Sequence, residues 1–368
     1  MDNTQQIPVA KTRHKEYSLI LAMFTIPVLL FLQHNASFIV VILLNLLALA
    51  AILGSAFSVV RHADVLAHRL GEPYGSLILS LAVVILEVSL ISALMATGDA
   101  GPTLMRDTLY SVIMIVTSGL VGLSLLMGGR KFATQHVNLA GIKQYLMAIM
   151  PLAIIVLVLP AMFESGTFSS VQLIFVALIS ASMYGVFLVI QTKTHQSLFV
   201  YEHEDDGDGP DDHHGKPSSH SNKWHGFWLV VHLVAVIAIT KINASSLETL
   251  LSGLNAPKQF TGFLIALLIL SPEGLGALKA VMANQVQRAM NLFFGSVLAT
   301  ISLTVPCVVI IALLKGQELV FGLEPANIVI LVSVLLLCQS SFATGRTNVL
   351  NGTAHLALFF AYLLVLMG

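Results

Sequence analysis

The sequence predicts an all-α polytopic membrane protein with about 11 transmembrane helices, one leading helix followed by two inverted five-helix repeats. Of its 368 residues, 56% are hydrophobic and only 10% are charged, whereas about a quarter of a soluble domain is charged. Apolar runs recur along the whole chain, and its two halves share a pattern. The formal net charge of −1 leaves no basic excess for a nucleic-acid partner.

Apolar runs define the predicted spans. A helix needs about 20 mostly apolar residues to cross the hydrocarbon of a bilayer. Runs of this kind predict spans near 17–32, 37–58, 75–97, 108–127, 144–163, 169–191, 226–241, 259–283, 289–314, 327–343 and 352–367. The first run follows three basic residues but precedes no small-residue cleavage site, so we expect a retained helix and not a signal peptide.

The basic residues predict the orientation. With the N-terminus in the cytoplasm, only four of the 18 lysines and arginines fall outside: Arg106, Lys241, Lys258 and Lys315. Because cytoplasmic loops carry an excess of Lys and Arg, this distribution favours a cytoplasmic N-terminus and a periplasmic C-terminus.

Two segments of the chain resemble each other. A short amphipathic piece that ends in Leu-x-x-Pro occurs at residues 65–73 and again at 249–257. Each piece leads into a span that carries one glutamate, Glu87 in the first half and Glu273 in the second. Because each repeat has an odd number of spans, the second copy is expected to be inverted in the membrane, a recurrent architecture of secondary transporters.

This pattern predicts four regions along the chain. The N-terminus and leading helix occupy residues 1–36, and the first repeat occupies 37–191. An acidic, histidine-rich cytoplasmic loop (192–223) separates it from the second repeat (224–368).

Glu87 and Glu273 are the candidate functional residues. A charged side chain at the bilayer centre costs about 2.5–3.5 kcal/mol on insertion scales, and such residues mark ion or proton pathways. A carboxylate there can hold a proton, or release it and bind a cation, but not both at once. A site of this kind with alternating access gives proton/cation exchange, and two neighbouring carboxylates titrate as one coupled unit. A structural pair of hydrogen-bonded carboxyls is the alternative.

Neighbouring oxygen atoms are expected to complete the site. Pro272 removes an amide donor and is expected to break its helix beside Glu273, which would offer backbone carbonyls to Na⁺ or Ca²⁺. Seven candidate supporting ligands lie on the same spans or the spans that follow: Ser80, Ser271, Asp107, Ser111, Asn291, Ser296 and Thr300. Each of them equally fits a role in helix–helix hydrogen bonding. Cys307 and Cys338 lack metal-binding spacing and are expected to be core residues, and no resident cofactor is expected.

The loop between the halves is acidic and rich in histidine. Its candidate cation- or pH-sensing residues are Glu202, His203, Glu204, Asp205, Asp206, Asp208, Asp211, Asp212, His213 and His214. A run that starts at Glu204 imitates a calcium loop, but its twelfth position is Gly215 instead of glutamate, which excludes an EF-hand. We interpret the loop as a solvated linker. A sensor whose histidines change charge near neutral pH is the alternative.

Three motifs carry a family resemblance. They are the run from Arg61-His62-Ala63-Asp64 to Glu87, the run Ser271-Pro272-Glu273-Gly274, and Gly345-Arg346-Thr347-Asn348-Val349-Leu350-Asn351-Gly352 with Tyr362. Together with the acidic loop they resemble the cation/proton exchanger branch of the calcium/cation antiporter superfamily. The resemblance implies a non-enzymatic antiporter of a bacterial inner membrane with Glu87 and Glu273 as its paired site. Its partners would be Na⁺, K⁺ or Ca²⁺, protons and the lipid bilayer, and association into a homo-oligomer is compatible with it.

The chain departs from the family pattern near both glutamates. The family usually carries a Gly-Asn pair beside each of them, whereas Ile85-Leu86 precede Glu87 here and Gly274-Leu275-Gly276 follow Glu273. Asn351 also replaces the glutamate of the terminal motif. Fewer amide oxygens weaken the case for a dedicated high-affinity calcium site and leave room for monovalent ions.

Two alternatives stay open from the sequence, a dedicated Ca²⁺/H⁺ exchanger and a passive cation channel. Matched repeats with acids that can titrate favour a carrier over a channel. An intramembrane enzyme is disfavoured, because the sequence has no H-E-x-x-H helix and no credible serine–histidine arrangement.

Deleting residues 202–214 tests the interpretation of the acidic loop. If the loop is a solvated linker, the pH profile of cation-driven proton release in everted vesicles stays unchanged. A displaced profile would instead assign the loop a sensing role, because only groups that titrate near neutral pH can move it.

Overall fold

The protein, a computed structural model, is described over residues 16–33, 36–70, 74–95, 101–163, 165–199 and 220–368. Within these ranges, eight helical segments are long and apolar enough to cross a membrane, and three further apolar helices are shorter. They match the predicted spans one by one. The predicted class, an all-α polytopic membrane protein, is therefore confirmed.

The first half of the chain builds seven α-helices. The elements are α1 (Tyr17–Leu32), α2 (Phe38–Leu70), α3 (Tyr74–Met95), α4 (Leu104–Met114), η1 (Ile115–Leu120), α5 (Val121–Phe132), β1 (Gln135–His136), α6 (Leu139–Ala153), η2 (Ile154–Val158), η3 (Leu159–Met162), α7 (Ser170–Val189), η4 (Ile190–Thr194) and η5 (Gln196–Phe199). A π-helical segment, η1, joins α4 to α5, so the three form one long rod.

The second half repeats the order of the helices from α2 onwards. Its elements are α8 (Asn222–Gly253), α9 (Gln259–Met282), α10 (Val286–Ala299), η6 (Thr300–Thr304), α11 (Val305–Lys315), α12 (Pro325–Ser341), β2 (Arg346–Thr347) and α13 (Val349–Met367). A π-helical segment again joins two α-helices into a rod, and η6 begins 185 residues after η1. This spacing nearly equals the 186 residues between Glu87 and Glu273. The inverted relation of the halves stays a prediction, which this correspondence supports.

The structure corrects two details of the sequence prediction. The helices predicted near 37–58 and 226–241 are longer than expected and include most of the amphipathic pieces, because α2 runs on to Leu70 and α8 runs on to Gly253. Pro272 does not break its helix, because α9 continues through it to Met282. Proline removes one hydrogen bond, but α9 is packed along α4 and α10, and such packing lets membrane helices tolerate an internal proline.

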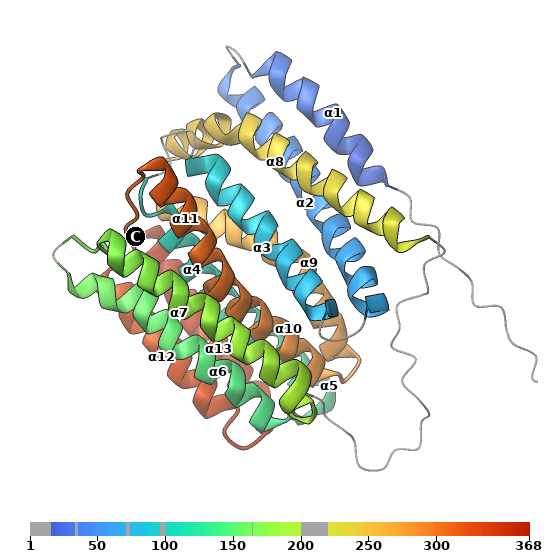
Figure 1. Ribbon diagram of the computed structural model, residues 1–368, viewed down its shortest axis with the longest axis vertical. Helices are drawn as coiled ribbons and strands as arrows, with labels where there is room; N and C mark the ends of the chain where they lie inside the picture. The colour runs from blue at the N-terminus through green and yellow to red at the C-terminus, as the bar shows by residue number, and fades with distance from the viewer. Residues whose placement is uncertain (1–15, 34–35, 71–73, 96–100, 164, 200–219) are drawn as a thin grey trace, which may run out of the picture.

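The helices form one roughly parallel bundle (Figure 1). α1 lies at one edge and packs against α2 and α8, which pack closely together. α3 and α9 follow towards the middle, and α6, α7, α12 and α13 form the opposite edge. The helices that carry the glutamates, α3 and α9, therefore lie between α2 and α8 on one side and the two rods, α4–η1–α5 and α10–η6–α11, on the other.

Loops from the two halves meet at both ends of the bundle. At one end β1, in the loop before α6, pairs antiparallel with β2, in the loop before α13. At the other end Thr167, in the loop before α7, bridges to Val320, in the loop before α12. At each end, the loop before the fourth helix of one half therefore meets the loop before the fifth helix of the other.

Glu16 ties the first helix to the bundle. Its carboxylate accepts hydrogen bonds from Arg61 in α2 at 2.7 Å and from His232 in α8 at 3.0 Å. Burial opposes ionisation of this group, but the His232 hydrogen bond and the Arg61 charge outweigh burial and hold the pKa of Glu16 below its usual value.

Glycines allow α5 and α13 to cross at close range. A Cβ built on Gly352 would lie 2.4 Å from the amide nitrogen of Leu126, and one on Gly122 would lie 2.9 Å from that of Leu356. Small residues at helix crossings are a common means of helix association in membranes, because they let backbones approach.

The substitution Gly352→Ala tests this crossing. The added methyl group meets backbone atoms that cannot move independently, so we expect a loss of about 1–3 kcal/mol in unfolding free energy. Thermal unfolding of the purified protein in detergent measures it. Gly185→Ala is the matched control, because no atom lies within 4 Å of its new Cβ. Equal melting temperatures for the two variants would contradict the close crossing.

Candidate functional site

Glu87 lies in the interior of the bundle. It sits on α3 with none of its surface exposed. Its Oε2 accepts two hydrogen bonds of 2.9 Å each, from the hydroxyls of Thr300 and Thr304. Both donors belong to η6, in the middle of the second rod. A side chain of the first half is therefore held by the second half.

The other oxygen of Glu87 is unsatisfied. Oε1 is buried and makes no hydrogen bond to any residue that the structure describes. The ion pairs among the described residues involve Glu16 and Asp107, so no Lys, Arg or His neutralises Glu87 there. An isolated buried carboxylate is costly, and such groups take up a proton or a cation.

Glu273 is the second carboxylate of the site. It lies on α9, and its Oε2 is also buried without a hydrogen bond in the described part of the chain. The hydroxyl of Ser296 on α10 lies beside it, although the geometry falls short of a strict hydrogen bond. Glu273 is close enough to Glu87 for the two charges to repel. The structure thus places the two predicted glutamates on neighbouring helices, α3 and α9, within reach of each other's charge.

The π-helical segment η6 positions the threonine donors. A π-helical turn widens the helix, and such turns are frequently found at functional sites. Thr300 and Thr304 are four residues apart, so both hydroxyls reach the same oxygen of Glu87. The sequence analysis named Thr300 but missed Thr304. Its i,i+4 spacing from Thr300 is the signal that could have found it.

The other predicted ligands make different contacts. Asp107 pairs with Arg106 at 2.8 Å, and Ser111 accepts a hydrogen bond of 2.8 Å from Tyr362. Asn291 donates to the carbonyl of Phe199. None of these three contacts joins a glutamate of the site. The bond from Tyr362 to Ser111 links two helices and the bond from Asn291 links α10 to η5, as the alternative role predicts, whereas Arg106 and Asp107 are neighbours in α4.

Two serines complete the predicted set. Ser271 donates to the carbonyl of Leu267, one turn back in its own helix. Ser80 is half-buried on α3, and no hydrogen bond joins it to Glu87 in the described part of the chain. The cation/proton role of all these residues stays a prediction. The sensing candidates from Glu202 to His214 lie outside the described residues.

A small polar cavity lies at the end of the bundle where α4 and α9 begin. It is lined by Asp107, Tyr110, Ser111, Gln259, Asn327, Tyr362 and Leu366. This end is the one predicted to face the periplasm. Asp107 and Ser111 therefore contribute to an outer polar cluster, not to the site of the two glutamates.

The terminal motif has a structural role. Asn348 caps α13 by accepting hydrogen bonds from the amides of Leu350 and Asn351, and the side chain of Asn351 bonds back to the amide of Asn348. This reciprocal pair is a capping box. The replacement of the family's glutamate by Asn351 therefore preserves a helix start and changes nothing at Glu87 and Glu273.

The sodium/calcium exchanger protein family matches residues 40–193 and 224–368. The chain belongs to this family. It is 71% identical over 366 residues to the sodium-potassium/proton antiporter ChaA of Escherichia coli (strain K12), an alignment that covers 100% of both proteins. It is 36% identical to the putative ionic transporter y4hA of Sinorhizobium fredii (strain NBRC 101917 / NGR234), over 88% of each.

Solved structures share the fold. The structure of native YfkE aligns with a TM-score of 0.73 at 19% identity and covers 95% of this chain and 99% of that one. The H⁺/Ca²⁺ exchanger CAX aligns with a TM-score of 0.67 at 15% identity, over 95% of this chain and 87% of that one. The fold predicted from the family resemblance is therefore confirmed, and the chain is a multi-pass membrane protein.

A double-mutant cycle tests the contact between Thr304 and Glu87. Thr304→Val removes one donor to a buried carboxyl, so we expect it to lower the unfolding free energy by about 1–3 kcal/mol. In a Glu87→Met background the same change should cost almost nothing, because no acceptor remains. Thr25→Val is the control, since that buried hydroxyl bonds only within its own helix. Equal costs of Thr304→Val in both backgrounds would contradict the contact.

Proposed function

We propose that this protein is a secondary active antiporter that exchanges cytoplasmic Na⁺, K⁺ or Ca²⁺ for protons in a bacterial inner membrane. The observation that carries the proposal is the pair Glu87 and Glu273. Glu87 is fully buried, Glu273 is half-buried with its Oε2 buried, and no positive charge of the described chain neutralises either. The names of its relatives, including a sodium-potassium/proton antiporter at 71% identity, support the same class.

The oxygen donors suit hard cations. Two carboxylates and the hydroxyls of Thr300, Thr304 and Ser296 gather at the site. Oxygen ligands favour Na⁺, K⁺ and Ca²⁺ over softer metals. A cation that enters neutralises the pair and displaces its protons, and a returning proton expels the cation. Coupling follows because the pair is not stable in the apolar interior without one or the other.

Close packing of one helix pair supports alternating access. α9 packs closely along α4, and a Cβ on Gly262 would lie 2.7 Å from the backbone of Asp107 and Thr108. This contact closes the end of the bundle predicted to face the periplasm. In an alternating-access cycle this pair would separate, and the equivalent pair, α3 and α10, would close the opposite end.

Replacing the carboxylates tests the proposal. Everted vesicles with an acidic interior receive Na⁺, K⁺ or Ca²⁺ in turn, and a pH-sensitive dye reports proton release. We expect Glu87→Gln and Glu273→Gln each to reduce cation-driven release to background, because an amide cannot exchange a proton for a cation. Glu318→Gln, at an exposed loop position, should retain the full rate.

Three outcomes would contradict the proposal. If no cation releases protons, the protein is not a proton-coupled cation exchanger. If Glu87→Gln and Glu273→Gln both retain full exchange, the two glutamates are not its site. Cation currents across a planar bilayer without any pH coupling would indicate a channel. Release by Ca²⁺ alone would retain the exchange mechanism but restrict the substrate to Ca²⁺.

A further inference from the structure

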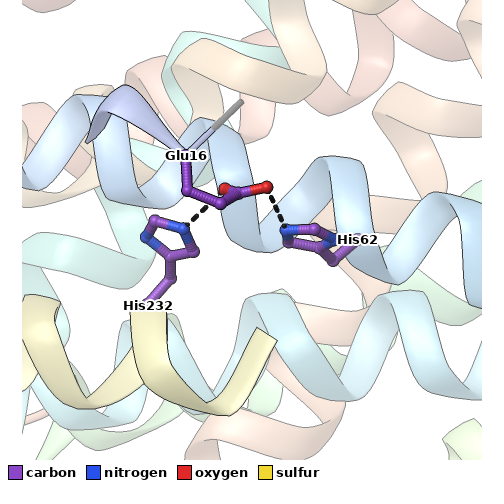
Figure 2. Close-up of side chains that lie close together, drawn as sticks. All are labelled: Glu16, His62 and His232. Atoms are coloured by element: carbon purple, nitrogen blue, oxygen red, sulfur yellow. Dashed lines mark hydrogen bonds and ion pairs between the residues drawn. The ribbon is translucent and has the colours of Figure 1, made fainter. Parts of the chain in front are cut away.

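A second polar cluster lies apart from the two glutamates. Glu16 precedes α1, His62 lies in the last third of α2, and His232 lies in the first third of α8 (Figure 2). His232 Nε2 is 3.0 Å from Glu16 Oε2, and His62 Nε2 is 3.4 Å from Glu16 Oε1. Both histidines are fully buried, while the carboxylate is 11% exposed. Three potential ligand atoms, from the residue before α1, from α2 and from α8, thus lie close together.

The neighbours of His62 suit metal binding through its Nε2. Its Nδ1 lies 2.8 Å from Nδ1 of His225, and its Nε2 lies 3.4 Å from a guanidinium nitrogen of Arg61 and 3.4 Å from Glu16 Oε1. In the tautomer in which Nδ1–H donates to His225, Nε2 keeps a lone pair for a metal ion. A histidine that binds a metal through Nε2 needs this same arrangement, with its other N–H held by an acceptor.

The ligand set and its spacing fit a metal ion. The ligand atoms of Glu16, His62 and His232 all lie within 4.8 Å of one another. Zinc in catalytic and structural sites accepts His nitrogens and carboxylate oxygens at about 2.0–2.2 Å, which places ligand atoms about 3.3–3.5 Å apart in a tetrahedron. We propose that these three residues form a binding site for a divalent transition-metal ion, with Zn²⁺ as the best-suited ion.

Arg61 is the built-in competitor for this site. Its guanidinium lies within hydrogen-bond distance of both Glu16 Oε2 and His62 Nε2, so it occupies the position of a cation. Its side chain is 34% exposed, which lets the guanidinium withdraw to solvent when a metal arrives. The metal then replaces the contact of Arg61 with Glu16 by bonds to Glu16, His62 and His232, which link the start of α1 to α2 and α8.

This site differs in chemistry from the site of the two glutamates. Imidazole nitrogens favour zinc and its neighbours in the transition series, whereas Na⁺, K⁺ and Ca²⁺ prefer oxygen alone. The proposal therefore does not depend on which cation is exchanged. A bound ion would hold the leading helix against the first helices of both halves, which are the helices that α1 contacts.

Cobalt binding to the purified full-length chain tests the proposal. Co²⁺ reports tetrahedral coordination by its visible absorption, and Zn²⁺ displaces it. His203, His213 and His214 are first replaced by alanine, so that the acidic loop contributes no signal. In this background we expect one tetrahedral Co²⁺ per chain and a higher melting temperature with Zn²⁺, because the metal links three helices.

Variants at the cluster separate a metal site from an ion-pair cluster. Glu16→Gln and His232→Gln should each weaken binding at least tenfold, and His225→Ala should weaken it about 10–100-fold through His62. Arg61→Gln should tighten binding, because it removes the competing cation. His195→Ala, at an exposed position, should leave binding unchanged.

Two results would overturn the proposal. The first is unchanged metal affinity in both Glu16→Gln and His232→Gln. The second is weaker binding in Arg61→Gln, which would show that the cluster needs its guanidinium. If His232→Gln does not fold, Glu16→Gln and Arg61→Gln still decide, because both changes lie at partly exposed side chains.

Discussion

Two carboxylates without a countercharge inside an apolar helix bundle are the constraint on which the rest of this structure depends. Glu87 receives only two hydroxyl donors, and one oxygen of each glutamate remains unsatisfied among the described residues. A permanent arginine would make the bundle more stable but would occupy the site for good. Hydroxyl groups are neutral donors, so they stabilise the carboxylate while leaving its charge to a proton or a cation.

The other buried acids of the described chain show the contrast. Asp107 lies against Arg106, and Glu16 lies against Arg61 with two histidines nearby. These acids are compensated within the protein, Asp107 by its neighbour in α4 and Glu16 by side chains of α2 and α8. Only the central pair is left for a mobile charge. The distinction is one of partners and not of burial, since Asp107 is nearly as buried as Glu87.

Much of the fold could be predicted from the sequence, because a chain that crosses lipid must form long apolar helices, and each such helix is visible as a local run of apolar residues. The central glutamates could be predicted for the same reason, since charge is rare in such runs. Thr304 could be inferred only from its i,i+4 spacing from Thr300, and its contact with Glu87 spans 217 positions. The cluster of Glu16, His62 and His232 could not be predicted, because it brings His232 to residues at least 170 positions earlier in the chain. Pro272 misled the prediction, because its local effect on hydrogen bonding is overridden by the helices packed around α9.

The contacts between the two halves indicate which helices would move in the proposed exchange cycle. The pairings β1–β2 and Thr167–Val320 tie a loop of one half to a loop of the other at each end, so the helices that follow these loops form a frame. The glutamates lie outside this frame, on α3 and α9. An element that switches between two states must contact the ligand that biases it. α3 and α9 meet this condition, because each carries one of the two carboxylates that a proton or a cation would neutralise.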